Sequence, residues 1–141
     1  MPSRWALPRV LPRSRGGVVF ADDEDRGTFV SIFRTCERRH DWTCEALALL
    51  STHYHAVLQS TRANLSLGLQ RLHSCYARSF NKRHNRFGHV FAERFSARVI
   101  EDEQYLYDAC AYVVANPVAA GLCERADEWP WSFSRLGLAD H

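Results

Sequence analysis

The chain has 141 residues, 46% of them hydrophobic and 24% charged, values typical of one globular domain with a substantial core. It has no run of eighteen apolar residues, so the sequence predicts no membrane-spanning helix and no membrane partner. The N-terminal residues lack the apolar segment of a secretory signal. Five scattered cysteines without a CxxC pair argue against a disulfide framework or a zinc knuckle and favour a reducing, cytoplasmic location.

The N-terminal segment is rich in proline. Three of the five prolines lie within residues 1–17, and the sequence predicts that this segment is poorly ordered and that a single domain spans residues 18–141. Pro12 restricts its surroundings to an edge strand or a loop. A weak first strand is expected somewhere within residues 9–20.

Residues 21–40 are predicted to form the first helix. Asp22 or Asp23 can cap its N-terminus, and the acidic residues that follow suit the positive end of the helix dipole. One buried face is indicated by apolar residues at the i, i+3, i+4, i+7 spacing. These residues are Phe29, Ile32, Phe33 and Cys36.

Two short apolar runs, Trp42–Leu50 and Tyr54–Gln59, are predicted to be antiparallel strands joined at Ser51-Thr52. Side chains at i and i+2 of a strand point to the same face, so His53 and His55 should project together. Two imidazoles on a rigid strand can form half of a divalent metal site. The alternative is a pair of half-buried histidines bonded to backbone or water.

Three further elements and a tail complete the prediction. A second helix is expected over residues 64–83, an extended stretch should become a strand near Ile100, and a third helix should begin at residues 101–103. Pro117 is expected to stop that helix, because the residue before a proline resists helical geometry. The side chains of Trp129-Pro130-Trp131 should pack against the rest of the domain, and a short helix should follow this segment.

The element order strand, helix, strand, strand, helix, strand is that of an α+β, ferredoxin-like antiparallel sheet with helices on one face. The added C-terminal helix decides the chemistry, because it could cross to the open face that holds the histidines. On that helix, Tyr105, Tyr112 and Asn116 share one stripe. From the helix alone, Tyr105 and Tyr107 compete with Tyr112 as a candidate nucleophile.

Basic side chains concentrate in the middle of the chain. Their bias toward one sign makes contact with a phosphate backbone about as plausible as simple solvation of an exposed helix face. The predicted DNA-binding residues are Arg71, Arg78, Lys82, Arg83, Arg86, Arg94 and Arg98.

Several longer segments resemble the single-tyrosine HUH transposases, in the branch of REP-associated tyrosine transposases. The resemblance extends over nearly everything from Phe20 to Arg135. It rests on FADDEDRGTF (Phe20–Phe29), HYHAVLQ (His53–Gln59), NLSLGLQRLHSCYARSFNKRH (Asn64–His84), GHVFAERF (Gly88–Phe95), YVVANPVAAGL (Tyr112–Leu122) and EWPWSF (Glu128–Phe133).

This resemblance implies a ferredoxin-like fold and an enzyme that cuts and rejoins single-stranded DNA through a 5′-phosphotyrosine intermediate. Position by position, His53 and His55 match the metal-binding histidines, Tyr112 the nucleophile and Asn116 the third metal ligand. Asn116 could instead merely end the helix beside Pro117. The implied cofactor is Mg²⁺ or Mn²⁺, and the implied partner is single-stranded DNA, with a hairpin or palindromic repeat. The protein would act as a monomer or homodimer.

Two other interpretations remain open. One is a catalytically degenerate, ferredoxin-like protein that binds single-stranded or hairpin DNA. The other is a replication-initiator or relaxase type of HUH enzyme, which the motifs disfavour. Two segments differ from the family pattern: Leu50-Ser51-Thr52 stands in place of Met-Pro-Asn, and the proline-interrupted residues 9–17 replace the usual first strand.

Overall fold

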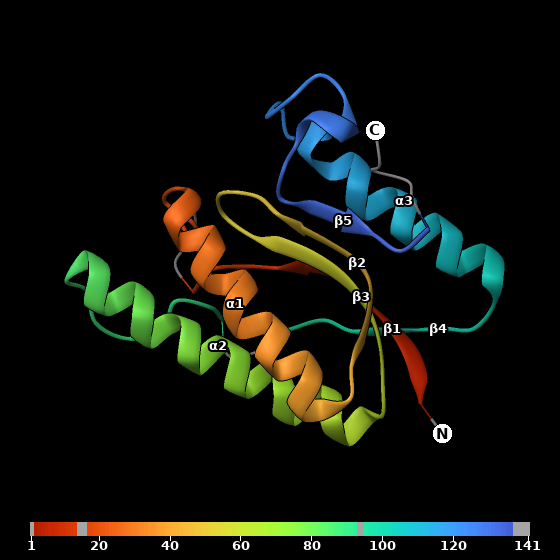
Figure 1. The fold of residues 1–141 in the computed structure, drawn as a ribbon, viewed down its shortest axis with the longest axis horizontal. Helices are drawn as coiled ribbons and strands as arrows, with labels where there is room; N and C mark the ends of the chain where they lie inside the picture. Colours follow the sequence, from red (N-terminus) through yellow and green to blue (C-terminus); the bar gives the residue numbers. More distant parts are fainter. Residues whose placement is uncertain (1, 14–16, 93–94, 137–141) are drawn as a thin grey trace.

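The computed structural model describes residues 2–13, 17–92 and 95–136, which form one five-stranded antiparallel sheet with three α-helices (Figure 1). The sheet order is β4-β1-β3-β2-β5. None of these helices is both long and apolar enough to cross a membrane. The elements are β1 (Ser3–Val10), α1 (Asp23–His40), β2 (Thr43–Leu49), β3 (Tyr54–Ser60), α2 (Arg62–His84), β4 (Arg98–Ile100), α3 (Glu103–Ala119), a short 3-10 helix (Ala126–Glu128) and β5 (Ser132–Ser134).

The predicted ferredoxin-like α+β fold is confirmed. Helices α1 and α2 cover one face of the sheet, hereafter the α1–α2 face, and α3 crosses the other, the α3 face (Figure 1). Alternation along β3 divides its side chains between two cores. Tyr54, Ala56 and Leu58 belong to the α1–α2 core, whereas Val57 belongs to the α3 core. His55 therefore points toward α3, as the strand period predicts.

The first strand differs from the prediction. The strand expected within residues 9–20 lies instead at Ser3–Val10, and these residues, predicted to be poorly ordered, form a central strand between β3 and β4. The pairing register with β3 shifts between Leu7 and Val10. Pro8 lies in this irregularity, where a missing N–H interrupts no regular ladder bond, so a proline is tolerated there.

The ends of the helices also correct the sequence-based prediction. Thr61 caps α2, so the helix begins at Arg62, two residues before the predicted start: the Thr61 side chain accepts a hydrogen bond from the Asn64 N–H at 3.2 Å. Pro117 does not stop α3, which continues to Ala119. A proline in the last turn gives up only its own N–H bond, and the Ala120 N–H still donates to the Asn116 carbonyl at 2.8 Å.

The tail closes the sheet on the far side of β2. The 3-10 helix precedes the two tryptophans and β5 follows them, so the short helix predicted after the tryptophans is wrong. The Trp129 indole donates to the Leu49 carbonyl at 2.9 Å, and the Trp131 indole donates to Asp23 at 2.8 Å. These bonds fasten the tail across β2 and the start of α1.

An aromatic cluster forms the centre of the α1–α2 core. Phe29 is fully buried, and five aromatic rings lie around it at centroid separations of 4.9–6.4 Å. Such ring pairs add to the free energy gained by burial alone. The five rings belong to Phe20, Phe33, Tyr54, Tyr76 and Phe91.

Replacing Phe29 with alanine should lower the free energy of unfolding by about 3–5 kcal/mol, because a cavity would open among rings from both helices and the sheet. Urea denaturation followed by tryptophan fluorescence measures this change. Phe87→Ala is the matched control: Phe87 is 95% exposed, so its loss should change stability by no more than about 0.5 kcal/mol. Equal effects of the two changes would contradict the assigned core.

Candidate active site

Small sheet residues allow α3 to pack closely over the strands that carry the histidines. Four short side chains face it, and Leu106, Cys110 and Val113 of α3 pack against them in a separate buried cluster. The contact positions of α3 recur every three or four residues, which places Tyr112 and Asn116 along one edge of the helix. The four sheet residues are Ala6, Ala46, Ala48 and Val57.

The structure brings the predicted nucleophile to the predicted metal ligands within one chain. The His53 and His55 ring centroids are 4.8 Å apart and nearly perpendicular. The Tyr112 ring lies 5.6 Å from the His55 ring at an interplanar angle of 86°. Tyr112 is 56% exposed, so much of this residue is open to solvent. Because Tyr105 and Tyr107 make no comparable ring contact among the described residues, the geometry favours Tyr112.

His55 is oriented by the irregularity in β1. Its Nδ1 forms a short hydrogen bond with the Pro8 carbonyl, and since a carbonyl only accepts, Nδ1 carries the proton. The unprotonated Nε2 is then a lone-pair donor, and it is buried without a hydrogen-bond partner in the described part of the chain. Burial lowers the pKa of His55, against the opposing effects of the Pro8 carbonyl and the nearby Asn116 side chain. A neutral imidazole with a free, buried nitrogen suits metal ligation.

His53 has a similar environment. Its Nδ1 lies 2.9 Å from the Thr52 hydroxyl. This hydrogen bond orients the ring and leaves Nε2, the other ring nitrogen, uninvolved. Burial, with smaller contributions from His55 and Arg9, lowers the pKa of His53 to about 4. His53 is therefore neutral near pH 7 and able to donate a lone pair.

Asn116 completes a mixed set of donors. Its side-chain amide donates to the Tyr112 carbonyl at 3.1 Å, which leaves the amide oxygen available. Two imidazole nitrogens and an amide oxygen fit a divalent cation such as Mn²⁺, with water or phosphate oxygens filling the other positions. No cluster of three or more His, Cys, Asp or Glu side chains suited to a metal occurs within residues 2–13, 17–92 and 95–136, so a cation at the histidine pair would need a ligand of another kind, such as the Asn116 amide.

The turn before His53 is held by a buried arginine. Arg26 donates to the Leu50 carbonyl through Nε at 3.2 Å and Nη2 at 3.1 Å, and to the Ser51 hydroxyl at 3.3 Å. The Ser51 carbonyl accepts from the Val19 and Phe20 N–H groups at 2.9 and 3.0 Å. The unusual Leu50-Ser51-Thr52 segment is thus held by several hydrogen bonds, and it presents His53 on a fixed loop.

Comparison with known proteins supports the same architecture. No protein-family model and no curated protein matches the chain. Among solved structures, a REP-associated tyrosine transposase bound to a REP hairpin superimposes with a TM-score of 0.81. The match covers 98% of this chain and 80% of that one, at 16% sequence identity. This chain has the fold of a REP-associated tyrosine transposase. This match confirms the predicted fold. A sequence identity of 16% shows the fold alone and does not show that this chain shares the activity of that protein.

Within this transposase fold, the predicted DNA-binding residues separate into two groups. Arg71, Arg78 and Lys82 are exposed on α2, with Arg86 just beyond its end, and so lie on the side of the sheet remote from Tyr112. Arg98 lies on β4 opposite Ala6, on the α3 face, and borders the same groove as Tyr112.

Two of the predicted DNA-binding residues do not join these groups. Arg83 binds Asp22 at 2.7 Å and Asp25 at 2.8 Å and also pairs with Glu24, which ties the end of α2 to the start of α1. The charge of Arg83 is therefore balanced within the protein, and a DNA phosphate could bind Arg83 only by displacing these carboxylates. Arg94 lies outside the residues that the structure describes.

Sequence reasoning missed three residues that support the site. Arg26 lies within one of the segments that carry the family resemblance, and an arginine on the buried side of a helix was a usable signal. Pro8 and Arg9 gave no signal. The Pro8 contact with His55 and the effect of Arg9 on the pKa of His53 depend on the pairing of β1 with β3, about fifty positions away in the chain.

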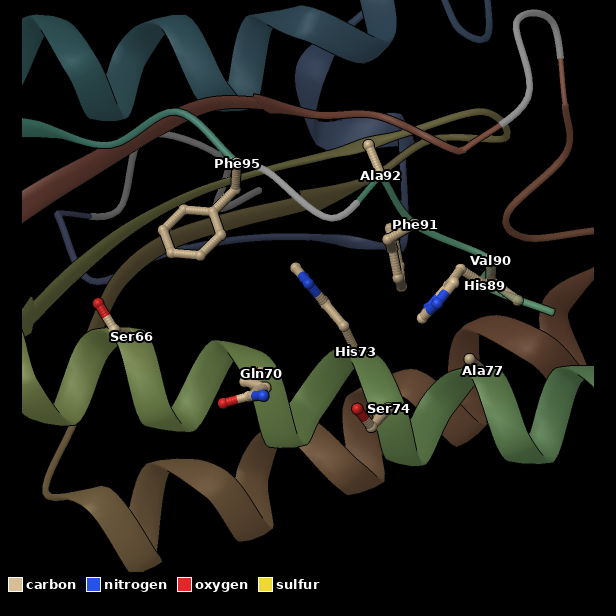
Figure 2. Close-up of a pocket in the computed structure, with 10 residues that line it drawn as sticks. All are labelled: Ser66, Gln70, His73, Ser74, Ala77, His89, Val90, Phe91, Ala92 and Phe95. Atoms are coloured by element: carbon tan, nitrogen blue, oxygen red, sulfur yellow. The ribbon is translucent and has the colours of Figure 1, made fainter.

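A second cavity opens on the α1–α2 face. It has a volume of about 450 Å³ and lies between α2 and residues 89–92 and 95. His73 lies on α2 between Phe91 and Phe95 (Figure 2). The His73 Nε2 is 2.7 Å from the Tyr54 hydroxyl, and its ring stacks on Phe91 at 4.3 Å. Tyr54 separates His53 and His55 in sequence, so this contact anchors β3 from the opposite face.

His73 should make stability depend on pH. Burial lowers its pKa from 6.5 to about 4. Between these values the unfolded chain binds a proton and the folded chain does not, so stability falls as pH drops from about 6.5 to 4, by on the order of 2–3 kcal/mol from this residue. Urea denaturation of wild type and His73→Gln over this pH range measures the contribution. The variant should show a shallower pH dependence; parallel profiles would contradict the prediction.

Proposed function

We propose that this protein is a metal-dependent HUH transposase that cleaves and rejoins single-stranded DNA through a 5′-phosphotyrosine intermediate. The observation that carries the proposal is the contact between the Tyr112 ring and His55, whose buried Nε2 has no partner within the described residues. An exposed phenol beside two neutral imidazoles is an arrangement suited to covalent phosphoryl transfer.

In the proposed step, the Tyr112 oxygen forms a bond to the scissile phosphorus while the bond from phosphorus to the upstream 3′ oxygen breaks. The phenol loses its proton to solvent and the 3′ oxygen gains one. The products are a 5′-phosphotyrosine and a free 3′-hydroxyl. Because the phosphotyrosine bond retains the energy of the phosphodiester, attack by another 3′-hydroxyl rejoins DNA without ATP.

A phenol is a weak nucleophile near pH 7 because almost all of it is protonated. The polarising group would be Mg²⁺ or Mn²⁺, held by the Nε2 atoms of His53 and His55 and by the amide oxygen of Asn116. When bound, such a cation draws charge off the scissile phosphate and orients it. The Pro8 carbonyl and the Thr52 hydroxyl contact the Nδ1 atoms of the two imidazoles, which would leave both Nε2 atoms to the cation.

The proposed substrate is single-stranded DNA that carries a hairpin. The similar solved structure is that of a transposase bound to a REP hairpin. The exposed residues Arg71, Arg78, Lys82 and Arg86 would contact the phosphate backbone, and Arg98 would contact the strand near Tyr112. Arg83 is left out of this set because it is bound to three carboxylates.

A covalent-adduct assay with a pool of substrates tests the proposal whatever the target sequence is. The protein is incubated with labelled hairpins whose single-stranded flanks are randomised, with Mn²⁺ or with EDTA, and then separated under denaturing conditions. We expect a labelled adduct with Mn²⁺ and none with EDTA. Tight hairpin binding without an adduct in Mn²⁺ or Mg²⁺ would instead identify a catalytically degenerate DNA-binding protein.

The α2 charges can be tested by binding alone. Arg78→Ala/Lys82→Ala should weaken hairpin binding at physiological ionic strength and reduce the slope of log K against log salt by about 2, since each lost phosphate contact contributes about 0.9. Fluorescence anisotropy over a range of salt concentrations measures both effects. Arg38→Ala/Arg39→Ala removes the same charge from the exposed end of α1 and should leave the slope nearly unchanged. Indistinguishable slopes would remove α2 from the interface.

A further inference from the structure

A groove lies directly beside the candidate nucleophile. Its volume is about 210 Å³, and it runs between α3 and strands β1 and β4. Tyr112 forms one wall, while its ring also contacts His55. Tyr105, two helical turns earlier, forms another wall, and the small side chains of Ala6 and Val57 contribute to the floor. The groove and the proposed reaction centre therefore share a side chain.

The lining is apolar apart from two charged groups. Asp108 is on the same stripe of α3 as Tyr105 and Tyr112, at the i, i+3, i+7 spacing. Arg98 projects from β4 opposite Ala6. Among the described residues, Asp108 accepts one hydrogen bond, from the Gln104 side chain at 2.9 Å, and Arg98 has no carboxylate within ion-pair distance. An acceptor and an unpaired cation thus border a narrow apolar slot.

We infer that this groove holds the base of a nucleotide adjacent to the scissile phosphate, an assignment that rests on the proposed function. A planar base would bury its faces against the tyrosine rings and the apolar floor. Arg98, unpaired in the described chain, would bind a neighbouring phosphate. The site thus matches the three parts of a nucleotide strand: a flat apolar face, a polar edge and an anionic link.

Asp108 would decide which bases are accepted. A carboxylate only accepts hydrogen bonds, and it pairs with the exocyclic amino group of a base edge. Cytosine, adenine and guanine carry such a group, whereas the donor of thymine is its ring N3–H, which lies between two carbonyl oxygens that repel a carboxylate. Asp108 should therefore favour amino-bearing bases over thymine, and it is a specificity-determining residue rather than a catalytic one.

The test compares two homopolymers whose bases differ only at positions 3 and 4 of the ring. Short single strands of 5-methyldeoxycytidine and of thymidine both carry the ring methyl, but only the first has the amino group. Their affinities are measured by fluorescence anisotropy in EDTA, where no cleavage intervenes. We expect the wild-type protein to prefer the amino-bearing strand by about tenfold, the discrimination of one good base contact.

Two variants localise the effect. Asp108→Asn should bring the affinity ratio close to one, because an amide can also donate to the thymine carbonyl. Glu124→Gln makes the same chemical change at an exposed site outside the groove and should keep the wild-type ratio. Thermal melting of each variant checks that the fold is intact. An absent preference in wild type, or a ratio that survives Asp108→Asn, would overturn the inference.

This experiment can contradict the assignment of the groove without contradicting the proposed function, and the reverse is also true. If Asp108→Asn removes the preference but no covalent adduct forms, the groove binds bases in a protein that does not cleave. If an adduct forms but Asp108→Asn leaves the preference unchanged, the transposase proposal stands and the assignment of the groove is wrong.

Discussion

Replacing Tyr112 with phenylalanine should abolish the covalent adduct with single-stranded DNA, with a loss of at least about 10³-fold in the rate of its formation. The change removes one oxygen atom, which is the atom that would bond to phosphorus. It keeps the ring that contacts His55, at a centroid separation of 5.6 Å, so packing and DNA binding should persist. Denaturing electrophoresis of labelled DNA measures the adduct, and anisotropy with the same hairpin measures binding.

Tyr107 offers a matched control for this experiment. It lies on the same helix and is 49% exposed, compared with 56% for Tyr112. Tyr107→Phe should form the adduct at the wild-type rate, because its phenol makes no ring contact with the histidine pair in the described structure. An adduct that survives Tyr112→Phe and disappears with Tyr107→Phe would assign the nucleophile to the other side of α3.

Replacing His55 with alanine should weaken Mn²⁺ binding by at least about 100-fold. Changes to groups that only support a metal ligand cost about 10–100-fold in metal affinity, and a direct ligand should cost no less. The change also deprives the Pro8 carbonyl of its hydrogen-bond donor, which should lower stability by about 1–3 kcal/mol. Calorimetric titration with Mn²⁺ measures the affinity, and urea denaturation shows that the variant remains folded.

His73→Gln is the appropriate comparison, because His73 is also a histidine with a pKa lowered by burial but lies on the opposite face of the sheet, bonded to Tyr54. Its replacement should leave Mn²⁺ affinity unchanged. Mn²⁺ binding that is lost with His73→Gln and kept with His55→Ala would place the cation in the cavity of Figure 2 instead.

The sequence by itself determined the three α-helices, strands β2, β3 and β4, and the division of the sheet into two faces. Alternation along Tyr54–Ser60 places His55 opposite Tyr54, and the apolar stripes of α1 and α2 predict their packing on Tyr54's side. These features depend on local periodicity, which survives wherever one face of an element is buried. The stripe of Tyr112 and Asn116 on one helix is equally local.

The tertiary structure alone decided how those groups are arranged in space. The position of β1 was not predicted, because the prolines of residues 1–17 argue against a strand there, whereas the irregularity between Leu7 and Val10, opposite His55, accommodates Pro8. Arg83 was predicted to be a cation available to DNA, yet three carboxylates at the start of α1 hold it. The spacing of side chains predicts which residues share one face of a helix or strand. Which other element packs against that face depends on contacts between residues far apart in the sequence. The family resemblance therefore selected Tyr112 from three tyrosines on one helix, and only the fold could bring its ring against His55.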